Sequence, residues 1–150
     1  QDTIHIPEHA PLDHHLWLRI ALQGRILRVD ETWAAARYHS EAKNVASPIE
    51  FGREAFRILD WVRTHPSLAE AVASVERRAK ASAFRVDSRY QLDGGQAWKS
   101  LVSWFRALVI HPPTALARLN ILVSTLLQLS GLRVLRDLYL ERRQARLRER

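Results

Sequence analysis

Cysteine and methionine are absent from the 150 residues, and there are only five glycines. Without cysteine the chain can form no disulfide, no thiolate metal site and no nucleophilic thiol, which fits a reducing compartment and predicts a cytoplasmic location. Methionine is missing even at position 1, and Gln1–Ile4 carry neither the basic nor the apolar region of a signal peptide. We therefore expect that residues upstream have been lost.

Long apolar runs are also lacking. The longest, Leu119–Leu129, is interrupted by Asn120, Ser124, Thr125 and Gln128. A transmembrane helix needs roughly 20 consecutive apolar residues. The sequence therefore predicts no transmembrane helix.

Several motifs of catalytic sites are missing as well. There is no Asp-x-Asp, no glycine-rich phosphate loop and no alternation of strands and helices that would hold a nucleotide. Four histidines lie early in the chain, but Pro7 separates His5 from His9, and the adjacent His14 and His15 point in different directions on a helix. We expect no metal ligands in this chain.

The composition is that of a globular protein, with 47% hydrophobic and 26% charged residues and a net charge of +7. The charge gathers at the C-terminal end, where seven Arg stand against three acidic residues from Gly131 onward. Such an end suits peripheral contact with an anionic membrane, or with nucleic acid. A solvated terminal helix explains the same charges equally well.

Periodicity predicts a mainly α protein. Asp13–Gln23 reads as a helix ended by Gly24, and Arg25–Val29 and Thr32–His39 are strand candidates. From Ser47 onward the pattern is entirely helical. One expected helix starts at the capping box Ser47–Glu50 and stops before Pro66, and a second runs from the capping box Ser67–Glu70 to about Leu92. Further helices are expected over 96–110, 114–129 and 132–150. We place a domain boundary at Val45–Ser47.

Two short motifs in the first part resemble a known family. The run Asp13-His-His-Leu-Trp-Leu-Arg19 and the later Arg37-Tyr38-His39-Ser40 with Lys43 are similar to the acceptor-side end of a family 2 glycosyltransferase domain of GT-A fold. Residues 1–46 then resemble the incomplete end of that domain, a short α/β remnant. Residues 47–150 resemble its helical C-terminal appendage, in which Tyr90–Pro112 has the look of a single tetratricopeptide-like (TPR-like) hairpin.

The resemblance implies a function and its residues. The intact enzyme would transfer a sugar from a nucleotide-sugar donor to a hydroxyl of a glycan acceptor, with a divalent Mg or Mn ion whose ligands are not in this chain. Asp13 aligns with the catalytic base, Trp17 would stack on a sugar, and Arg37, His39 and Lys43 would contact the donor diphosphate. Lacking the nucleotide-binding half, this chain should be inactive alone.

Each of these residues has a simpler interpretation. Asp13 also fits a helix N-cap, Trp17 a core indole, and Arg37, His39 and Lys43 a solvated loop. Two other functions also stay open. One is an independent basic all-α module that binds an anionic membrane or nucleic acid, and the other is a helical scaffold that pairs with a protein through the 98–110 and 119–129 faces.

Overall fold

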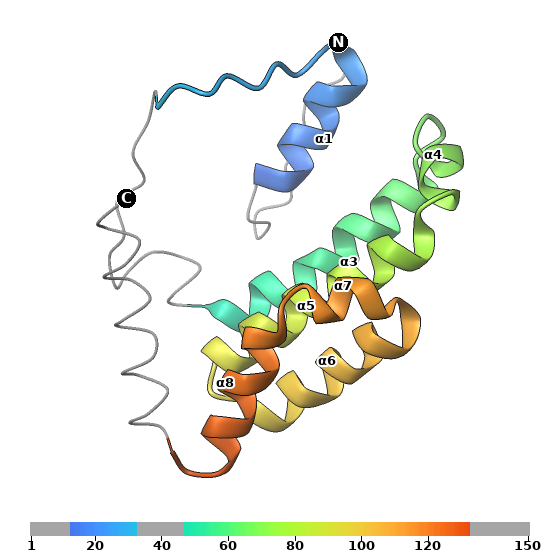
Figure 1. Cartoon of the computed structure of the whole chain (residues 1–150). Helices are drawn as coiled ribbons and strands as arrows, with labels where there is room; N and C mark the ends of the chain where they lie inside the picture. The colour runs from blue at the N-terminus through green and yellow to red at the C-terminus, as the bar shows by residue number, and fades with distance from the viewer. Residues whose placement is uncertain (1–12, 33–46, 133–150) are drawn as a thin grey trace.

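A computed structural model describes residues 13–32 and 47–132, and within these ranges the protein consists of seven helices without a strand (Figure 1). The helices from α3 to α8 form a bundle that begins at Ser47, and α1 lies outside it. The helices are α1 (Asp13–Gln23), α3 (Pro48–Thr64), α4 (Ala69–Ala73), α5 (Glu76–Asp93), α6 (Ala97–Ile110), α7 (Pro112–Leu116) and α8 (Leu119–Leu129). The mainly α prediction is therefore confirmed.

The predicted strand Arg25–Val29 was wrong. These residues follow α1 as an exposed stretch without secondary structure, and Leu27 is 84% exposed. A strand needs a neighbour that pairs with its backbone N–H and C=O groups, and no described segment supplies one. The α/β remnant is thus not seen in the described part of the chain. The second strand candidate, Thr32–His39, lies outside the described residues except for Thr32, and the boundary at Val45–Ser47 stays a prediction.

Helices α1 and α3 begin and end close to where the sequence places them. Helix α1 spans Asp13–Gln23 as predicted, and the Gly24 N–H donates to the Ile20 carbonyl at 3.1 Å. In α3, Pro48 occupies the first turn, where a missing N–H is harmless. The capping box itself does not form: the Ser47 side chain makes no cap hydrogen bond, and Glu50 pairs with Arg53 at 2.7 Å instead.

The long helix predicted from Ser67 to about Leu92 is in fact two helices, α4 and α5, separated at Ser74 and Val75. The Ser74 hydroxyl donates back to the Ala71 carbonyl at 2.8 Å, and Val75 leaves the helical region with φ near −122°. A side chain that bonds the preceding turn competes with the helical ladder, and a β-branched residue favours extended backbone. The helix predicted over 114–129 is similarly divided into α7 and α8, and 133–150 lies outside the described residues.

Helix α5 is the centre of the bundle, with α3 on one side and α6 on another, while α8 packs on α6 (Figure 1). Helices α5 and α6 form an antiparallel hairpin, because Arg77 near the start of α5 donates to the Ile110 carbonyl at the end of α6, at 3.0 Å. The turn between them uses Gly95, whose φ of +78° suits glycine. This is the helical hairpin expected near Gly94-Gly95.

The interior of the bundle is built mainly from small side chains. Its hydrophobic cluster holds three alanines, Trp104 and Ile121, with Phe84 and Leu108 among the half-buried residues packed against it. Beside this cluster runs a seam of buried hydroxyl groups that crosses three helices. We call it the hydroxyl seam: Ser88 on α5, Ser100 on α6 and Thr125 on α8.

The hydroxyl seam is a continuous chain of hydrogen bonds. The Ser88 hydroxyl donates to the Ser100 carbonyl at 2.8 Å, and the Ser100 and Thr125 hydroxyl groups lie 3.0 Å apart. Thr125 also donates to the Ile121 carbonyl within its own helix, at 2.8 Å. Because each buried hydroxyl has a partner, the seam avoids the cost of burying an unpaired polar group.

Replacing Thr125 with valine tests the seam. Valine keeps the shape but removes the hydroxyl that Ser100 contacts, so we expect T125V to lower the free energy of unfolding by about 1–2 kcal/mol. Thr64 provides a matched control, since its hydroxyl also bonds a carbonyl four residues back, to Asp60 at 3.1 Å, but at an exposed position. T64V should change stability by less than about 0.5 kcal/mol. Urea unfolding followed by circular dichroism measures both; equal stability of T125V and the parent would contradict a stabilising seam.

Gly52 should not tolerate a larger side chain. A Cβ at this position would lie 2.8 Å from Asp87 Oδ1 and 3.2 Å from the Asp87 Cα on α5. We expect G52A to lower the free energy of unfolding by about 1–3 kcal/mol through this overlap, despite the gain of about 1 kcal/mol in helix propensity. Gly24, with no atom within 4 Å of such a Cβ, is the control. An unchanged urea midpoint for G52A would contradict the close contact between α3 and α5.

Candidate functional site

Asp13 and Trp17 lie on helix α1. Asp13 is its first residue, and Trp17 lies one turn further along with 56% of its surface exposed. Leu16 and Ile20 on the same helix are exposed as well. Within the described residues, then, Trp17 is not packed in a core, and α1 presents an aromatic and aliphatic surface beyond its N-terminal turn. Such a surface can stack on the apolar face of a ligand or pack on another part of a larger protein.

The remaining candidates from the sequence lie elsewhere. Arg37, His39 and Lys43 fall between the two described ranges, so the structure does not test whether they approach Asp13 and Trp17. His5 and His9 also lie outside the described residues. Within 13–32 and 47–132, no group of three or more His, Cys, Asp or Glu side chains could hold a metal ion.

His15 connects α1 to the bundle. Its ring contacts the Trp61 ring of α3 edge-on, with centroids 4.4 Å apart. Partial burial, and secondarily the charge of Arg19 one turn along, lower the pKa of His15 from its usual value. Both effects favour the neutral imidazole, which is the form that packs on an indole without losing hydration of a charge.

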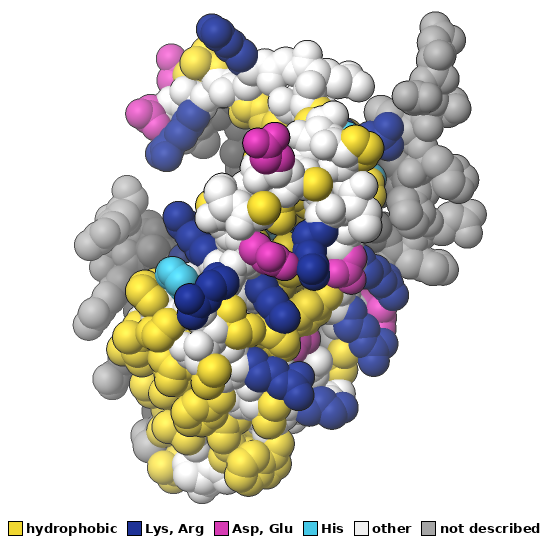
Figure 2. Space-filling model, turned by 90° about the vertical axis from the view of Figure 1, so that its right-hand side faces the viewer, with side chains coloured by type: hydrophobic (Ala, Val, Ile, Leu, Met, Phe, Trp, Pro, Cys, Tyr) yellow, Lys and Arg dark blue, Asp and Glu magenta, His cyan; other side chains and the backbone are white. Residues whose placement is uncertain are grey.

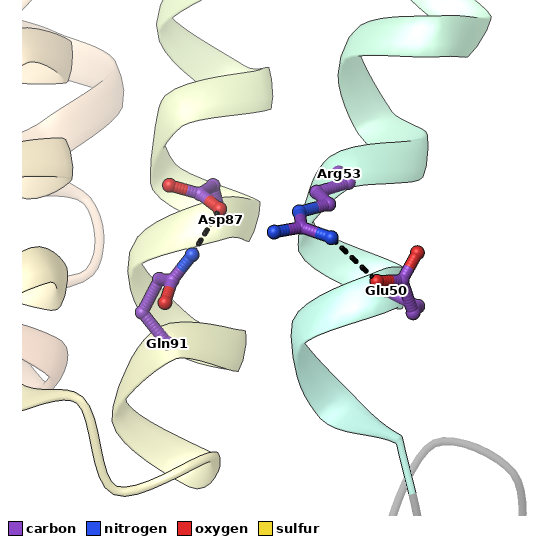
Figure 3. A network of polar contacts seen from close by, with 4 residues as sticks. All are labelled: Glu50, Arg53, Asp87 and Gln91. Atoms are coloured by element: carbon purple, nitrogen blue, oxygen red, sulfur yellow. Dashed lines mark hydrogen bonds and ion pairs between the residues drawn. The ribbon is translucent and has the colours of Figure 1, made fainter.

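Asp87 is a buried residue of α5 whose carboxylate is bonded by other side chains of the bundle (Figure 3). It accepts a hydrogen bond from the Gln91 amide at 3.1 Å and another from the Ser103 hydroxyl of α6. Glu50 and Arg53 form a separate, exposed pair on α3. Because Asp87 also lies against Gly52, it is enclosed where α3, α5 and α6 meet. We interpret it as a polar contact of the bundle.

An apolar groove of about 520 Å³ runs along α6. Helix α5 contributes Lys80 and Phe84 to its lining, and the remaining residues come from α6: Trp98, Leu101, Val102, Phe105, Arg106, Val109 and Ile110. The Arg106 guanidinium lies 5.7 Å from the centroid of the Phe84 ring. The groove is therefore hydrophobic and bordered by positive charge.

More positive charge lies where α5 meets the α7–α8 connection. Arg85 is half-buried on α5, and Arg118 is the residue that precedes α8. Burial, and then repulsion by Arg118, lower the pKa of Arg85 from its usual value. The two guanidinium groups thus raise the local positive potential, which attracts anions.

The sequence identified the helices that carry this surface and most of the inward side of α6, but it placed Phe105 on the wrong side. Periodicity favoured one face made of Ala97, Leu101, Trp104, Phe105 and Leu108. In the structure Ala97 and Trp104 are buried, but Phe105 is half-exposed, while Ser100, Ser103 and Ala107 are buried instead. The signal that was missed is the row of small residues, which lets a helix approach its neighbours closely.

Comparison with protein-family models, curated proteins and solved structures gives no match to this chain. Its function is therefore inferred from its residues and their arrangement. No described helix is long and apolar enough to cross a bilayer.

The pKa of His15 can be measured by following its Cε1–H resonance with pH. We expect a value below the unperturbed 6.5, and an increase when Arg19 is replaced by glutamine, because the second cause of the shift is then removed. R25Q, which removes an equal charge that does not contribute to the shift, is the control. A His15 pKa at or above 6.5 would contradict the contact with Trp61.

The lowered pKa of His15 also determines how its contribution to stability changes with pH. The folded protein binds the His15 proton more weakly than the unfolded chain does. The contribution of His15 to the free energy of unfolding is therefore at its full value above pH 6.5, where the imidazole is neutral in both states. Its contribution declines as the pH falls from 6.5 through the lower folded pKa. The packing of α1 on Trp61 should weaken over the same interval.

Proposed function

We propose that this chain is the C-terminal part of a family 2 glycosyltransferase. The intact enzyme transfers a sugar from a nucleotide-sugar donor to a hydroxyl group of an acceptor during polysaccharide or glycan assembly. Residues 1–46 belong to the acceptor-side end of its GT-A domain, and residues 47–150 form a helical appendage with a TPR-like hairpin. This chain by itself is inactive, because it contains no Asp-x-Asp motif or phosphate-binding loop.

One observation carries this proposal: the motif Asp13–Arg19 forms a helix that begins at Asp13, and that helix does not bury its own apolar residues. Leu16, Trp17 and Ile20 on α1 are exposed, as is Leu27 beyond it. A helix of this kind gains little from folding alone. It is what remains visible when the layers that should cover it belong to another part of the protein.

The chemistry assigns a role to each motif residue. Asp13 takes the proton from the acceptor hydroxyl as that oxygen attacks the anomeric carbon of the donor sugar. The exposed indole of Trp17, one turn along, provides a stacking platform for the acceptor. Arg37, His39 and Lys43 would supply positive charge to the departing nucleoside diphosphate. A divalent Mg or Mn ion, held by residues outside this chain, would add positive charge there.

Two opposing electrostatic effects act on a general base at the N-terminus of a helix. The helix dipole stabilises a carboxylate there and makes it a weaker base. A bound acceptor that excludes water acts in the opposite direction, because it removes hydration from the anion. Proton transfer from the acceptor hydroxyl to Asp13 is thus favoured only when the acceptor site is closed. Catalysis is in this way coupled to acceptor binding.

The test uses the longest open reading frame that contains this chain, assayed for nucleotide release from nucleotide sugars in the presence of Mg or Mn. We expect D13N to lower kcat by about 100-fold or more, because the general base is lost. Asp30 provides the control, since it is an exposed carboxylate whose partner is Arg28, at 3.3 Å. D30N should retain activity. Full activity of D13N, or an upstream sequence without an Asp-x-Asp motif, would overturn the proposal.

A further inference from the structure

The exposed side of α6 carries four large apolar residues at helical spacing. Trp98, Val102, Phe105 and Val109 recur at intervals of four, three and four residues, which places them on one face. Trp98 is 70% exposed and Val109 78% exposed, and the two residues between them are about half-exposed. We call these four residues the α6 stripe. Leaving such side chains in water is unfavourable, so a continuous stripe marks a contact surface.

The α6 stripe borders the apolar groove shared with α5. Phe84 and Leu101 continue the apolar lining, while the cations Lys80 and Arg106 lie at the same groove. Figure 2 shows hydrophobic side chains gathered over the part of the bundle built from α6 to α8, with Lys and Arg side chains along the border of this area. The surface therefore combines an apolar centre with a cationic edge.

Acidic residues are missing from this half of the bundle. From Gly94 to Leu132 the sequence has no Asp or Glu, but it contains Lys99, Arg106 and Arg118. All three cationic side chains are exposed. Elsewhere in the described part, some exposed Arg residues pair with acids, as Arg53 does with Glu50 and Arg63 with Glu76. The partner of the α6 surface must therefore bring the negative charge.

This requirement separates the candidates for the partner. A second copy of the chain would place cations against cations, and so would residues 133–150, whose seven Arg exceed their three acids. Nucleic acid supplies negative charge but offers little to two exposed valines. An anionic bilayer surface matches all the groups: aliphatic residues enter the acyl boundary, an indole lies at the headgroup level, and Lys and Arg contact the lipid phosphates.

We propose that the α6 stripe and its bordering cations form a docking surface for an anionic membrane. The helix lies in the plane of the interface with Trp98 and Val109 inserted, and Lys80 of α5 contacts the lipid headgroups. This binding is shallow and peripheral, and it involves residues that take no part in sugar transfer. Its success or failure is therefore distinguishable from that of the enzymatic proposal.

The experiment is flotation of the full chain with lipid vesicles. One set contains only phosphatidylcholine, and the other contains roughly 30% phosphatidylglycerol, which makes the surface negative. We expect at least about tenfold stronger partitioning onto the anionic vesicles, and a marked loss when NaCl is raised from about 0.1 M to about 0.5 M, because salt screens the cations. Equal partitioning onto both vesicle types would overturn the proposal.

Variants locate the binding on the α6 stripe. W98S/V109S should lower partitioning onto anionic vesicles about tenfold or more, since two inserted side chains are removed. The control L27S/V75S removes two exposed apolar residues outside the stripe and should have no effect. Because all four positions are exposed, helix content by circular dichroism should stay unchanged in both variants. Equal loss in both double variants would overturn the assignment to α6.

Two further measurements distinguish insertion from surface attraction. Brominated acyl chains should quench tryptophan fluorescence on binding, and W98F should retain binding while losing most of this quenching.

Neutralising three Arg of the C-terminal end, as R142Q/R143Q/R146Q, should weaken binding less than W98S/V109S does. If that Arg variant abolishes binding and W98S/V109S does not, the C-terminal end is the membrane contact and the proposal fails. A dimer in light scattering that W98S/V109S converts to monomer without vesicles would likewise overturn it in favour of self-association.

Discussion

The close approach of α5, α6 and α8 through small side chains is the constraint on which the rest of this fold depends. Alanine and serine at the crossing points leave little room between the helices, and hydroxyl groups then replace large apolar residues as the contacts. Each seam hydroxyl is bonded to a neighbour, so the seam itself avoids the cost of unpaired groups. Gly52 extends the same principle to α3, where a Cβ would meet Asp87.

An interior filled by small residues leaves the large apolar residues outside. Along α6, the seam uses Ser100 while Trp98, Val102 and Val109 point to the surface. Trp104 is buried on the same helix, so α6 departs only in part from the usual pattern, in which the large side chains of an amphipathic helix form the core. The hydrophobic effect that would normally hold such a bundle together is thus partly unused within it, and remains available for binding something else.

Local signals in the sequence predicted the helices well and their faces poorly. Pro48 and Gly24 marked helix ends correctly, because their effects on the backbone do not depend on tertiary contacts. The break at Ser74 was missed because a hydroxyl that bonds the preceding turn looks like any other polar position. On α6 the 3.6-residue period misplaced Phe105, which is exposed because Ser100, Ser103 and Ala107 occupy the inner face. At the N-terminal motif, the sequence placed Asp13 and Trp17 on one helix, but spacing alone cannot bring Arg37, His39 and Lys43 to them, since that depends on tertiary packing.

The two parts of the described chain share one physical property, which is apolar surface that their own contacts do not cover. In α1 that surface follows a motif suited to an acceptor sugar, and its attachment to α3 includes a ring contact between His15 and Trp61. In α6 the surface adjoins Lys80 and Arg106, and α6 itself carries no acidic residue. The function and the membrane contact that we propose would use both faces: one would hold the acceptor and the other would keep the protein at the lipid surface. Because the two faces use different helices, either can change without unfolding the other, and the interior seam keeps α6 in place for its contact.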